Sequence, residues 1–515
     1  MVWLPWRGRF LMSMASNVVL LSDQGEPDWI ARTRYYNNPA DPNDPDDIAV
    51  DGNGNVAVAV SGSPSFGIQS YNKYAGLTNL RFNNGIESSG GGKSSPDGKF
   101  VHYADGTTKV FYTPTFDDPA GINTWQVYNV FDVDVSDGSL TTFAYGRDSN
   151  VQYNDGGYTT MTSAGGDSSG NFYGCGFTRR SGGNEYPYLV KYNSSSVVQW
   201  SLVLQPQIAT FTGGGVSSAN FGSSQEMVSD TSGNTYVSLR HTTDSSDPPT
   251  FTIKLMKFNA SGVQQWVRVV EDIGTIFSSD GTYLYSAAQA TATSVRVVAT
   301  DVSDGTIAWE RTLSFGGGIS NTNTRKILIA GGYVYVLVNA TNSASNDTNN
   351  DGMTWVKMTT SGTVEWNRHI YASGSFSTDY FYPNGAHTGA VVGDKMYTTF
   401  RGLENAPTVV KLPLDGSKTG LVGKFPFIGF GGSAPFTYNN YVADINVTTL
   451  TITPSTTSTA TSVSGTYATT TTTMTTADVD VLSLSVTYDK AGIASALAPA
   501  NVYNPVVAYS KRVLR

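Results

Sequence analysis

The chain has 515 residues, which exceeds one ordinary domain unless the fold is a barrel or a repeat array. Charged residues make up 14% of the sequence, aromatic residues make up 12%, and 54 residues are Gly, so the composition favours many short strands joined by turns. The net charge of −9 argues against a protein that binds nucleic acid by neutralising phosphates. The single cysteine, Cys175, excludes an intrachain disulfide and a multi-cysteine metal site.

Residues 1–44 are predicted to be an N-terminal arm with an acidic linker. Ser13, Ser16 and Asn17 interrupt the apolar run near the start, so the segment is a poor secretory signal. No stretch of about 18 apolar residues occurs, and we expect no membrane span. The Pro- and Asp-rich stretch at 37–47 indicates an extended linker rather than a metal site. Met1, Met12 and Met14 are all open as start residues.

A repeat occupies residues 45–420. Each unit contains a turn, a strand with Tyr or Phe, a polar loop, a further strand, a Gly-containing turn, and a strand with Trp. The clearest units end at Trp200, Trp266, Trp309 and Trp366. Weaker units begin at Asp51, Ser95 and Val391, and the last two have Thr142 and Gly420 where the Trp would stand. The pattern predicts about seven units of several short strands each.

Such a repeat predicts an all-β chain whose main part is a β-propeller of about seven blades, with almost no helix. A small antiparallel sheet cannot bury both of its faces alone, whereas blades stacked around an axis bury each face against a neighbour. We expect the four Trp side chains to fill the gaps between blades, because a Trp buries a large apolar area and needs one partner for its N–H. They are therefore predicted to be packing residues and not a ligand cage.

The unit "ATDVSDGTIAW" carries a family resemblance. Ala299, Asp301, Gly305 and Trp309 resemble the tryptophan-docking motif of the quinoprotein-type β-propellers, with Thr306 in place of the usual Lys. The resemblance implies the blade architecture over about residues 45–420. Enzymes of that family use pyrroloquinoline quinone, and many of them stack it on a disulfide between neighbouring cysteines. Cys175 has no such neighbour and no carboxylate-rich calcium and quinone site is visible, so we expect no cofactor and no quinoprotein dehydrogenase activity.

Other catalytic patterns are absent from the sequence. The spacing of a sialidase box is missing, and no GxSxG elbow or Walker loop occurs. The four histidines, which we expect on the surface or in loops, form no ligand pair; they are His102, His241, His369 and His387. Cys175 lies in a strand-like stretch and is predicted to be buried and not a nucleophile. We therefore predict no catalytic residues and no enzyme.

A weak calcium candidate lies at Asp347, Asn349 and Asp351, followed by Gly352. The twelfth position of the loop is Met358 and not Glu, so the bidentate ligand of a calcium loop is missing. The same residues suit a hairpin loop rich in Asn and Asp, which is the favoured interpretation.

Residues 421–515 are dominated at first by Thr, Ser and Val. An O-glycosylated stalk is one interpretation. Stretches such as "TLTIT" alternate like strands, so a β-rich module, or a strand exchanged with a neighbouring subunit, is preferred. The last residues form a predicted terminal arm, and we expect Tyr509, Lys511 and Arg512 to contact another subunit in an assembly.

The leading functional hypothesis is a non-enzymatic structural component of a virus particle, a bacteriophage tail or fibre-type protein that acts in assembly or host attachment. Its predicted location is the virion, and its predicted partners are other virion proteins, copies of itself and, as a further candidate, a host surface glycan, with no nucleic acid. One alternative is a bacterial cell-surface or exported propeller that binds glycan or protein. Another alternative is a propeller hydrolase or lyase, which would bring several acids, bases or Arg side chains together.

Overall fold

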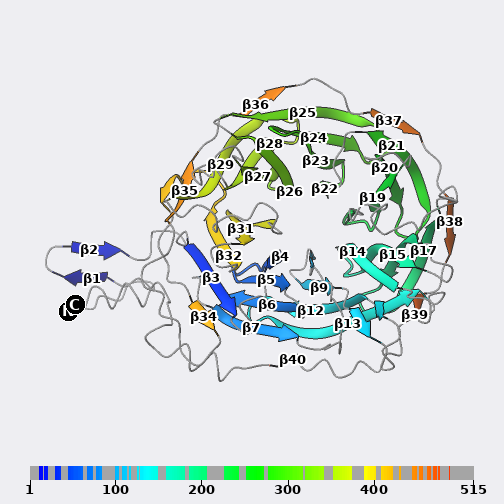
Figure 1. Ribbon diagram of the computed structural model, residues 1–515, viewed down its shortest axis with the longest axis horizontal. Helices are drawn as coiled ribbons and strands as arrows, with labels where there is room; N and C mark the ends of the chain where they lie inside the picture. The colour runs from blue at the N-terminus through cyan, green and yellow to red at the C-terminus, as the bar shows by residue number, and fades with distance from the viewer. Residues whose placement is uncertain are drawn as a thin grey trace.

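The computed structural model of the protein is a closed ring of seven antiparallel sheets around one axis (Figure 1). The structure describes residues 11–14, 17–20, 29–35, 44–61, 66–73, 77–83, 99–103, 107–112, 115–117, 124–126, 128–148, 158–179, 185–205, 226–242, 251–271, 276–316, 319–341, 352–373, 388–401, 407–421, 428–430, 444–448, 452–455, 461–464, 468–471, 474–475 and 486–487. These residues form strands and turns and contain no helix, and accordingly no membrane-spanning helix. The predicted all-β, seven-bladed propeller is confirmed.

Each of the first six blades contains four strands in chain order from the axis outwards, and in blade 2 the strands β10 and β11 of another sheet intervene in the chain. Blade 1 contains β4 (Asp44–Val50), β5 (Val56–Ser61), β6 (Phe66–Tyr71) and β7 (Leu77–Asn83), and blade 2 contains β8 (Lys99–His102), β9 (Thr108–Tyr112), β12 (Tyr128–Asp134) and β13 (Ser139–Asp148). Blade 3 contains β14 (Tyr158–Gly166), β15 (Phe172–Arg179), β16 (Glu185–Tyr192) and β17 (Val198–Gln205), and blade 4 contains β18 (Glu226–Ser229), β19 (Thr235–Thr242), β20 (Phe251–Phe258) and β21 (Gln264–Glu271). Blade 5 contains β22 (Ile276–Ser279), β23 (Tyr283–Thr291), β24 (Ser294–Asp301) and β25 (Ile307–Phe315), and blade 6 contains β26 (Asn321–Ala330), β27 (Tyr333–Thr341), β28 (Gly352–Thr359) and β29 (Val364–Ser373).

Blade 7 takes its fourth strand from the other end of the chain. It contains β30 (Thr388–Val392), β31 (Lys395–Arg401) and β32 (Pro407–Pro413), followed by β3 (Trp29–Tyr35). The innermost strand β4 contacts both β8 and β30, so blades 1 and 7 are adjacent and the ring is closed. Outside the blades, β1 (Leu11–Met14) pairs with β2 (Asn17–Leu20), and β10 (Thr115–Asp117) pairs with β11 (Thr124–Gln126) beside β14.

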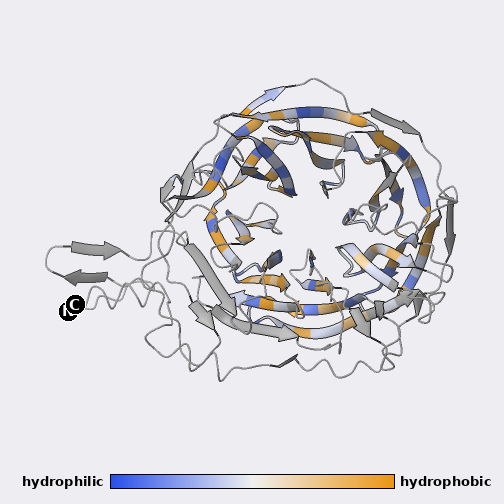
Figure 2. Cartoon of the chain, in the orientation of Figure 1, coloured by the Kyte–Doolittle hydropathy of each residue, from blue (hydrophilic) through white to orange (hydrophobic). Residues whose placement is uncertain are grey.

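Hydrophobic side chains from neighbouring blades fill the spaces between the sheets. Buried clusters lie between each successive pair from blades 1 and 2 to blades 6 and 7. Between blades 5 and 6, for example, Val295 and Val297 pack with Val334 and Val336. The alternation of hydrophobic and hydrophilic residues along the strands is visible in Figure 2. It follows from the period of two in a strand, which sends successive side chains to opposite faces of a blade.

The four predicted Trp residues lie at matching positions in the fourth strands of blades 3 to 6. The indole Nε1 of Trp200 donates to the carbonyl of Ala260 in blade 4 at 3.1 Å. The same bond joins Trp266 to Val302 at 3.2 Å and Trp309 to Thr360 at 2.8 Å, each time in the turn of the next blade. Each ring also packs on a turn Gly with positive φ, as Trp200 packs on Gly262 (φ 78°), where a Cβ would lie 2.9 Å from the indole. The side chains are partly buried, which fits docking on a blade surface.

Strand β3 lies in the range that was predicted to be an arm outside the propeller. In the structure it pairs with β32, and Trp29 stands opposite Lys411. In blade 3, Trp200 stands opposite Lys191 in the same way, and Lys191 donates to the carbonyl of Ala260 in the next blade. Lys411 likewise donates to a carbonyl of the next blade, that of Lys73 in blade 1, at 3.4 Å. Trp29 therefore occupies the docking-Trp position of blade 7, which the repeat in the sequence had placed at Gly420.

The C-terminal strands do not gather into a module of their own. From β34 onwards they run around the rim of the propeller in reverse blade order, and each pairs with the outer strand of one blade, whereas β33 pairs with β35 (Figure 1). These strands, the belt, are β33 (Gly420–Leu421) and β35 (Asp444–Thr448) on blade 6, β34 (Ile428–Phe430) on blade 7, β36 (Ile452–Ser455) on blade 5, β37 (Thr461–Ser464) on blade 4, β38 (Ala468–Thr471) on blade 3, β39 (Met474–Thr475) on blade 2 and β40 (Val486–Thr487) on blade 1. Strands with backbone groups left to pair at a sheet edge readily accept a further strand, which explains the pairing.

Candidate functional site on the propeller axis

One residue of each innermost strand stands at an equivalent position beside the axis. In every blade it stands four positions before the first hairpin turn, and its cross-strand partner stands four positions after that turn. In blade 1, for example, Asp47 pairs with Ala59 across the turn 51–55, and in blade 4 Glu226 pairs with Ser238 across the turn 230–234. From blade 1 to blade 7 these residues, which we call the axial ring, are Asp47, Lys99, Ser163, Glu226, Ile276, Lys326 and Thr388.

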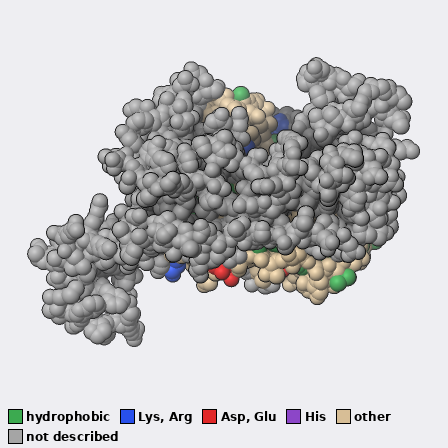
Figure 3. Space-filling view, turned by 60° about the horizontal axis from the view of Figure 1, so that its bottom comes forward, with side chains coloured by type: hydrophobic (Ala, Val, Ile, Leu, Met, Phe, Trp, Pro, Cys, Tyr) green, Lys and Arg blue, Asp and Glu red, His purple; other side chains and the backbone are tan. Residues whose placement is uncertain are grey.

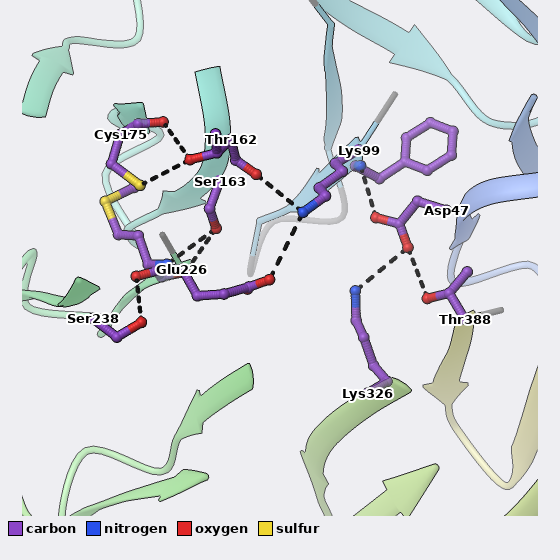
Figure 4. A network of polar contacts seen from close by, with 11 residues as sticks. Asp47, Lys99, Thr162, Ser163, Cys175, Glu226, Ser238, Lys326 and Thr388 are labelled. Carbon is purple, nitrogen blue, oxygen red and sulfur yellow. Dashed lines mark hydrogen bonds and ion pairs between the residues drawn. The ribbon is translucent and has the colours of Figure 1, made fainter. Parts of the chain in front are cut away.

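The axial ring contains the same triplet of residue types twice. The first triplet, from blades 6, 7 and 1, is Lys326, Thr388 and Asp47, and we call it the tight arc. The second triplet, from blades 2, 3 and 4, is Lys99, Ser163 and Glu226, and we call it the open arc. In both arcs the lysine and the acid form an ion pair across the blade that carries the hydroxyl residue (Figure 4).

In the tight arc, Asp47 is buried and joins four blades. Its Oδ1 accepts hydrogen bonds from the backbone N–H of Ile48 at 3.0 Å and from the Thr388 hydroxyl at 3.0 Å. Its Oδ2 accepts the backbone N–H of Phe100 in blade 2 at 2.9 Å. The ammonium of Lys326, from blade 6, lies 3.4 Å from Oδ1. Hydrogen bonds from several donors stabilise the ionised carboxylate. Because these donors come from four blades, Asp47 holds the four blades together at the axis.

In the open arc, the acid is longer, more exposed and less tightly held. The Nζ of Lys99 donates to the carbonyl of Thr162 at 3.0 Å and lies 3.7 Å from Oε1 of Glu226. Ser163 bonds to the backbone of Met227 next to Glu226, accepting its N–H at 3.1 Å and donating to its carbonyl at 3.3 Å. The Glu226 side chain is 28% exposed, against 6% for Asp47. Glu226 is thus the ring acid that a ligand on the axis can reach.

Three of the innermost strands carry a β-bulge beside an axial-ring residue. The bulges lie in β4, β14 and β26, and the extra residues are Asp46, Thr162 and Arg325. A bulge inserts one residue into a strand and re-aims its side chains, and bulges are enriched next to active sites. Burial lowers the pKa of the Arg325 guanidinium from its ordinary value. At the level of the axial ring, these three strands therefore depart from regular β geometry.

Other side chains singled out in the sequence lie away from the axial ring or have no reactive setting. Cys175 is buried, and burial raises the pKa of its thiol to about 12, so it is not a nucleophile at neutral pH. His369 was expected on the surface or in a loop but is buried in β29, where its Nδ1 lies 2.9 Å from the Thr354 hydroxyl. The side chains of His102, His241 and His387 are outside the described residues.

No group of three or more His, Cys, Asp and Glu side chains that could hold a metal ion occurs in the described ranges. The calcium candidate Asp347, Asn349 and Asp351 lies outside the described residues, and so do Tyr509, Lys511 and Arg512. The described surface in Figure 3 is mainly uncharged, with isolated acidic, basic and hydrophobic side chains. Its exposed large hydrophobic residues, Val197 and Val263, lie in equivalent turns of blades 3 and 4 and make too small a patch for a partner site.

Sequence reasoning missed the axial ring entirely. Its residues share no sequence motif. They are equivalent only because each stands four positions before the first hairpin turn of its blade. The turns that begin at Asp51, Asp167 and Asp230 are visible in the sequence, and counting four residues back from them reaches Asp47, Ser163 and Glu226. This spacing is the signal that could have found the site.

No protein-family model matches the sequence, and no curated protein matches it. Several solved structures are similar in fold. The β-propeller domain of the Trilobed protease from Pyrococcus furiosus is 10% identical over 72% of this chain and 95% of its own, with a TM-score of 0.36. The phage phi92 endosialidase is 10% identical over 81% of this chain and 76% of its own, with a TM-score of 0.37. An ulvan lyase, a polysaccharide lyase, is 12% identical over 72% of this chain and 94% of its own, with a TM-score of 0.38.

These comparisons correct the prediction that the protein is not an enzyme. The similar structures are mostly enzymes, among them an arabinanase, an arabinofuranosidase, the ulvan lyase and the endosialidase. At 12% identity or less, the likeness itself extends to the propeller fold. No family model supports a quinoprotein-type repeat, although the Trp docking that suggested it is present in the blades.

Proposed function

We propose that the protein is a polysaccharide-cleaving enzyme, a hydrolase or a lyase, with its site at the axial ring. The observation that carries the proposal is the ion pair of Glu226 and Lys99, which is partly exposed in the axial ring, where every residue except Ile276 is polar. Sugar hydroxyls donate and accept hydrogen bonds, and a ring of carboxylate, hydroxyl and ammonium groups suits such a ligand. The ring also meets the condition stated for this alternative from the sequence, that acids and bases come together.

In this proposal Glu226 transfers the proton. A carboxyl group beside the scissile bond gives a proton to the leaving oxygen when it is protonated, or takes one from an attacking water or from a sugar carbon when it is ionised, and such catalysis typically contributes about 10²- to 10⁴-fold in rate. Lys99 holds the carboxylate in place and binds the substrate with Lys326. Asp47 supports the ring and takes no part in proton transfer, because its oxygens accept hydrogen bonds from two backbone N–H groups and the Thr388 hydroxyl.

The test is a screen of the purified full chain against plant, algal and bacterial polysaccharides. Released reducing ends report cleavage of either kind, and the ultraviolet absorbance of unsaturated products reports elimination. Against a substrate found in this way, Glu226→Gln is expected to lose at least about 100-fold in kcat with unchanged thermal stability. The matched control is Glu365→Gln, which neutralises an exposed glutamate on the outer strand β29. Full activity of Glu226→Gln, or no cleavage of any polysaccharide by the wild type, would overturn the proposal.

A second proposal rests on the belt. A strand from the belt lies outside the last blade strand in each of the seven sheets, so every outer blade edge is covered over part of its length. Covered edges resist aggregation and suit a protein exposed outside a cell. We infer a place in a virus particle, as a bacteriophage tail or fibre-type protein beside other virion proteins and its own copies; the bacterial cell surface is the alternative. Mass spectrometry and immunogold labelling of purified particles test this, and absence from the particles would refute it.

A further inference from the structure

We infer that the axial ring takes an anionic glycan, one that carries carboxylate or sulfate groups, and that Lys326 and Lys99 hold its anionic group. This inference rests on the proposed function and specifies the ligand of the same site. It also assigns Asp47 as a positioning residue that fixes the ammonium of Lys326 beside the axis.

The formal charge of the axial ring differs from the charge of the side chains that a ligand can reach. Asp47 and Glu226 balance Lys99 and Lys326, so the formal sum is zero. The side chains are unequally accessible, however: Lys99 is 39% exposed and Lys326 is 34% exposed, whereas Asp47 is 6% exposed. A ligand that arrives along the axis therefore meets two ammonium groups and one carboxylate, that of Glu226. The accessible part of the ring is positive.

Asp47 is buried among its donors. It accepts two backbone N–H groups and the Thr388 hydroxyl in addition to Lys326. Its negative charge is therefore already matched within the protein. Among the described residues, Asp47 is the one group that pairs with the Lys326 ammonium. The Lys326 side chain is therefore held at the ring by Asp47 while 34% of its surface stays exposed to a ligand.

The two lysines come from different parts of the ring. Lys99 comes from blade 2 and Lys326 from blade 6, and Figure 4 shows the Lys99 ammonium beside Glu226 and the Lys326 ammonium beside Asp47. A polymer lying across the axis meets both. An ammonium is a compact point charge that binds carboxylate and sulfate oxygens alike, so both kinds of acidic sugar share the required chemistry. Two such cations are too few for phosphate-driven binding of a nucleic acid.

The experiment measures binding by isothermal titration at low salt, with four defined probes. Oligogalacturonate is paired with its methyl ester, and a sulfated galactan oligosaccharide is paired with its desulfated form. We expect one or both of the anionic probes to bind at least about tenfold more tightly than the neutral partner. Lys326→Met and Lys99→Met should each lose most of this preference. Lys395→Met, which removes a lysine paired with the exposed Asp394 at the turn of blade 7, should retain it.

Two variants that each remove one negative charge distinguish a positioning role of Asp47 from a general effect of the net charge on binding. Glu226→Gln removes the accessible negative charge and should tighten binding of the anionic probe about threefold to tenfold. Asp47→Asn should weaken it, because Lys326 loses its anchor, although the net charge changes by the same amount. Tighter binding by both variants would overturn the positioning role of Asp47. If Asp47→Asn does not fold, Thr388→Val, which removes one donor to Asp47, replaces it with the same expected direction.

The outcomes for the ligand class and for the proposed function are distinguishable. Binding of an anionic probe without cleavage supports the inference and leaves the proposed enzymatic activity without support. Cleavage of neutral polysaccharides with no preference for anionic probes supports the enzyme and overturns the inference. Equal affinity for the charged and neutral members of both probe pairs, or full affinity in Lys326→Met, also overturns it.

Discussion

In both arcs of the axial ring a lysine and an acid lie two blades apart, with a hydroxyl residue from the intervening blade between them. In the tight arc the acid is Asp47, whose short side chain keeps its carboxylate at the backbone, where it accepts the N–H groups of Ile48 and Phe100. In the open arc Glu226 is one methylene longer and reaches away from its strand, and its ammonium partner is 3.7 Å distant. The comparison teaches that the length of the acidic side chain decides whether its carboxylate is buried among donors of the fold or stays accessible to a ligand.

The arcs also differ in where they lie along the chain. The open arc spans three blades that follow one another in sequence, whereas the tight arc spans the closure between blades 7 and 1. The clamp made by Asp47 therefore stands beside blade 7, the blade that is assembled from the two ends of the chain. We infer that the tight arc stabilises the closed ring, and that the open arc is left available for binding.

The largest expected difference between the arcs is in the free energy of unfolding. Asp47→Ala leaves the buried N–H of Phe100 and the Lys326 ammonium without their acceptor, and should cost about 3 to 5 kcal/mol. Glu226→Ala breaks a partly exposed pair and should cost less than about 1 kcal/mol. Chemical denaturation of the two variants measures both values. Equal costs would mean that the arcs do not differ as described.

A smaller difference is expected from the Trp residues that dock the blades of each arc. Trp200 docks blade 3 on blade 4 within the open arc, and the register places Trp29 at the equivalent position in the fourth strand of blade 7. Trp200→Ala and Trp29→Ala should each cost about 3 kcal/mol. Only Trp29→Ala is expected to make the closure susceptible to limited proteolysis, because that junction joins the two ends of the chain. If Trp29→Ala is as stable as the wild type, Trp29 does not serve as a docking residue.

The smallest expected effect separates the two hydroxyl residues. Thr388 donates to Asp47 in the tight arc, whereas Ser163 bonds to the backbone of Met227 in the open arc. Thr388→Val and Ser163→Ala should each destabilise the fold by about 1 kcal/mol. Only Thr388→Val should change the chemical reactivity of Lys326, measured by quantitative acetylation and mass spectrometry. An equal change in Ser163→Ala would show that Lys326 is not controlled through the tight arc.

The repeat could be predicted from sequence because its signals are local. A Gly turn followed by a Trp four residues later fixes a hairpin and its docking side chain, as at Gly262 and Trp266, within one blade. The docking position of blade 7 could not be found in this way. Its Trp is Trp29, which pairs with Lys411 across almost the whole chain, and no local pattern records that pairing.

The belt and the axial ring were missed for a related reason. The Thr- and Ser-rich segment alternates like strands, and its partners are the outer strands of blades far earlier in the chain, as Ile452 pairs with Phe315. In the axial ring, single residues such as Asp47 and Lys326 meet only after the ring has closed. No sequence motif singles these residues out, and only the register of the first hairpin in each blade reveals that they share one level of the axis.

The shared blade 7 has a consequence for how the nascent chain acquires its shape. Strand β3 is translated before blade 1, and its partner β32 follows roughly 370 residues later. At about 5 to 20 residues per second, the ribosome needs roughly 20 to 70 s to reach that partner. During this interval β3 lacks its blade partner, and the growing chain is an open crescent of blades. Only when the last-made blade recruits this earliest of the blade strands does the crescent become a ring, after which the belt can pair with its outer edges.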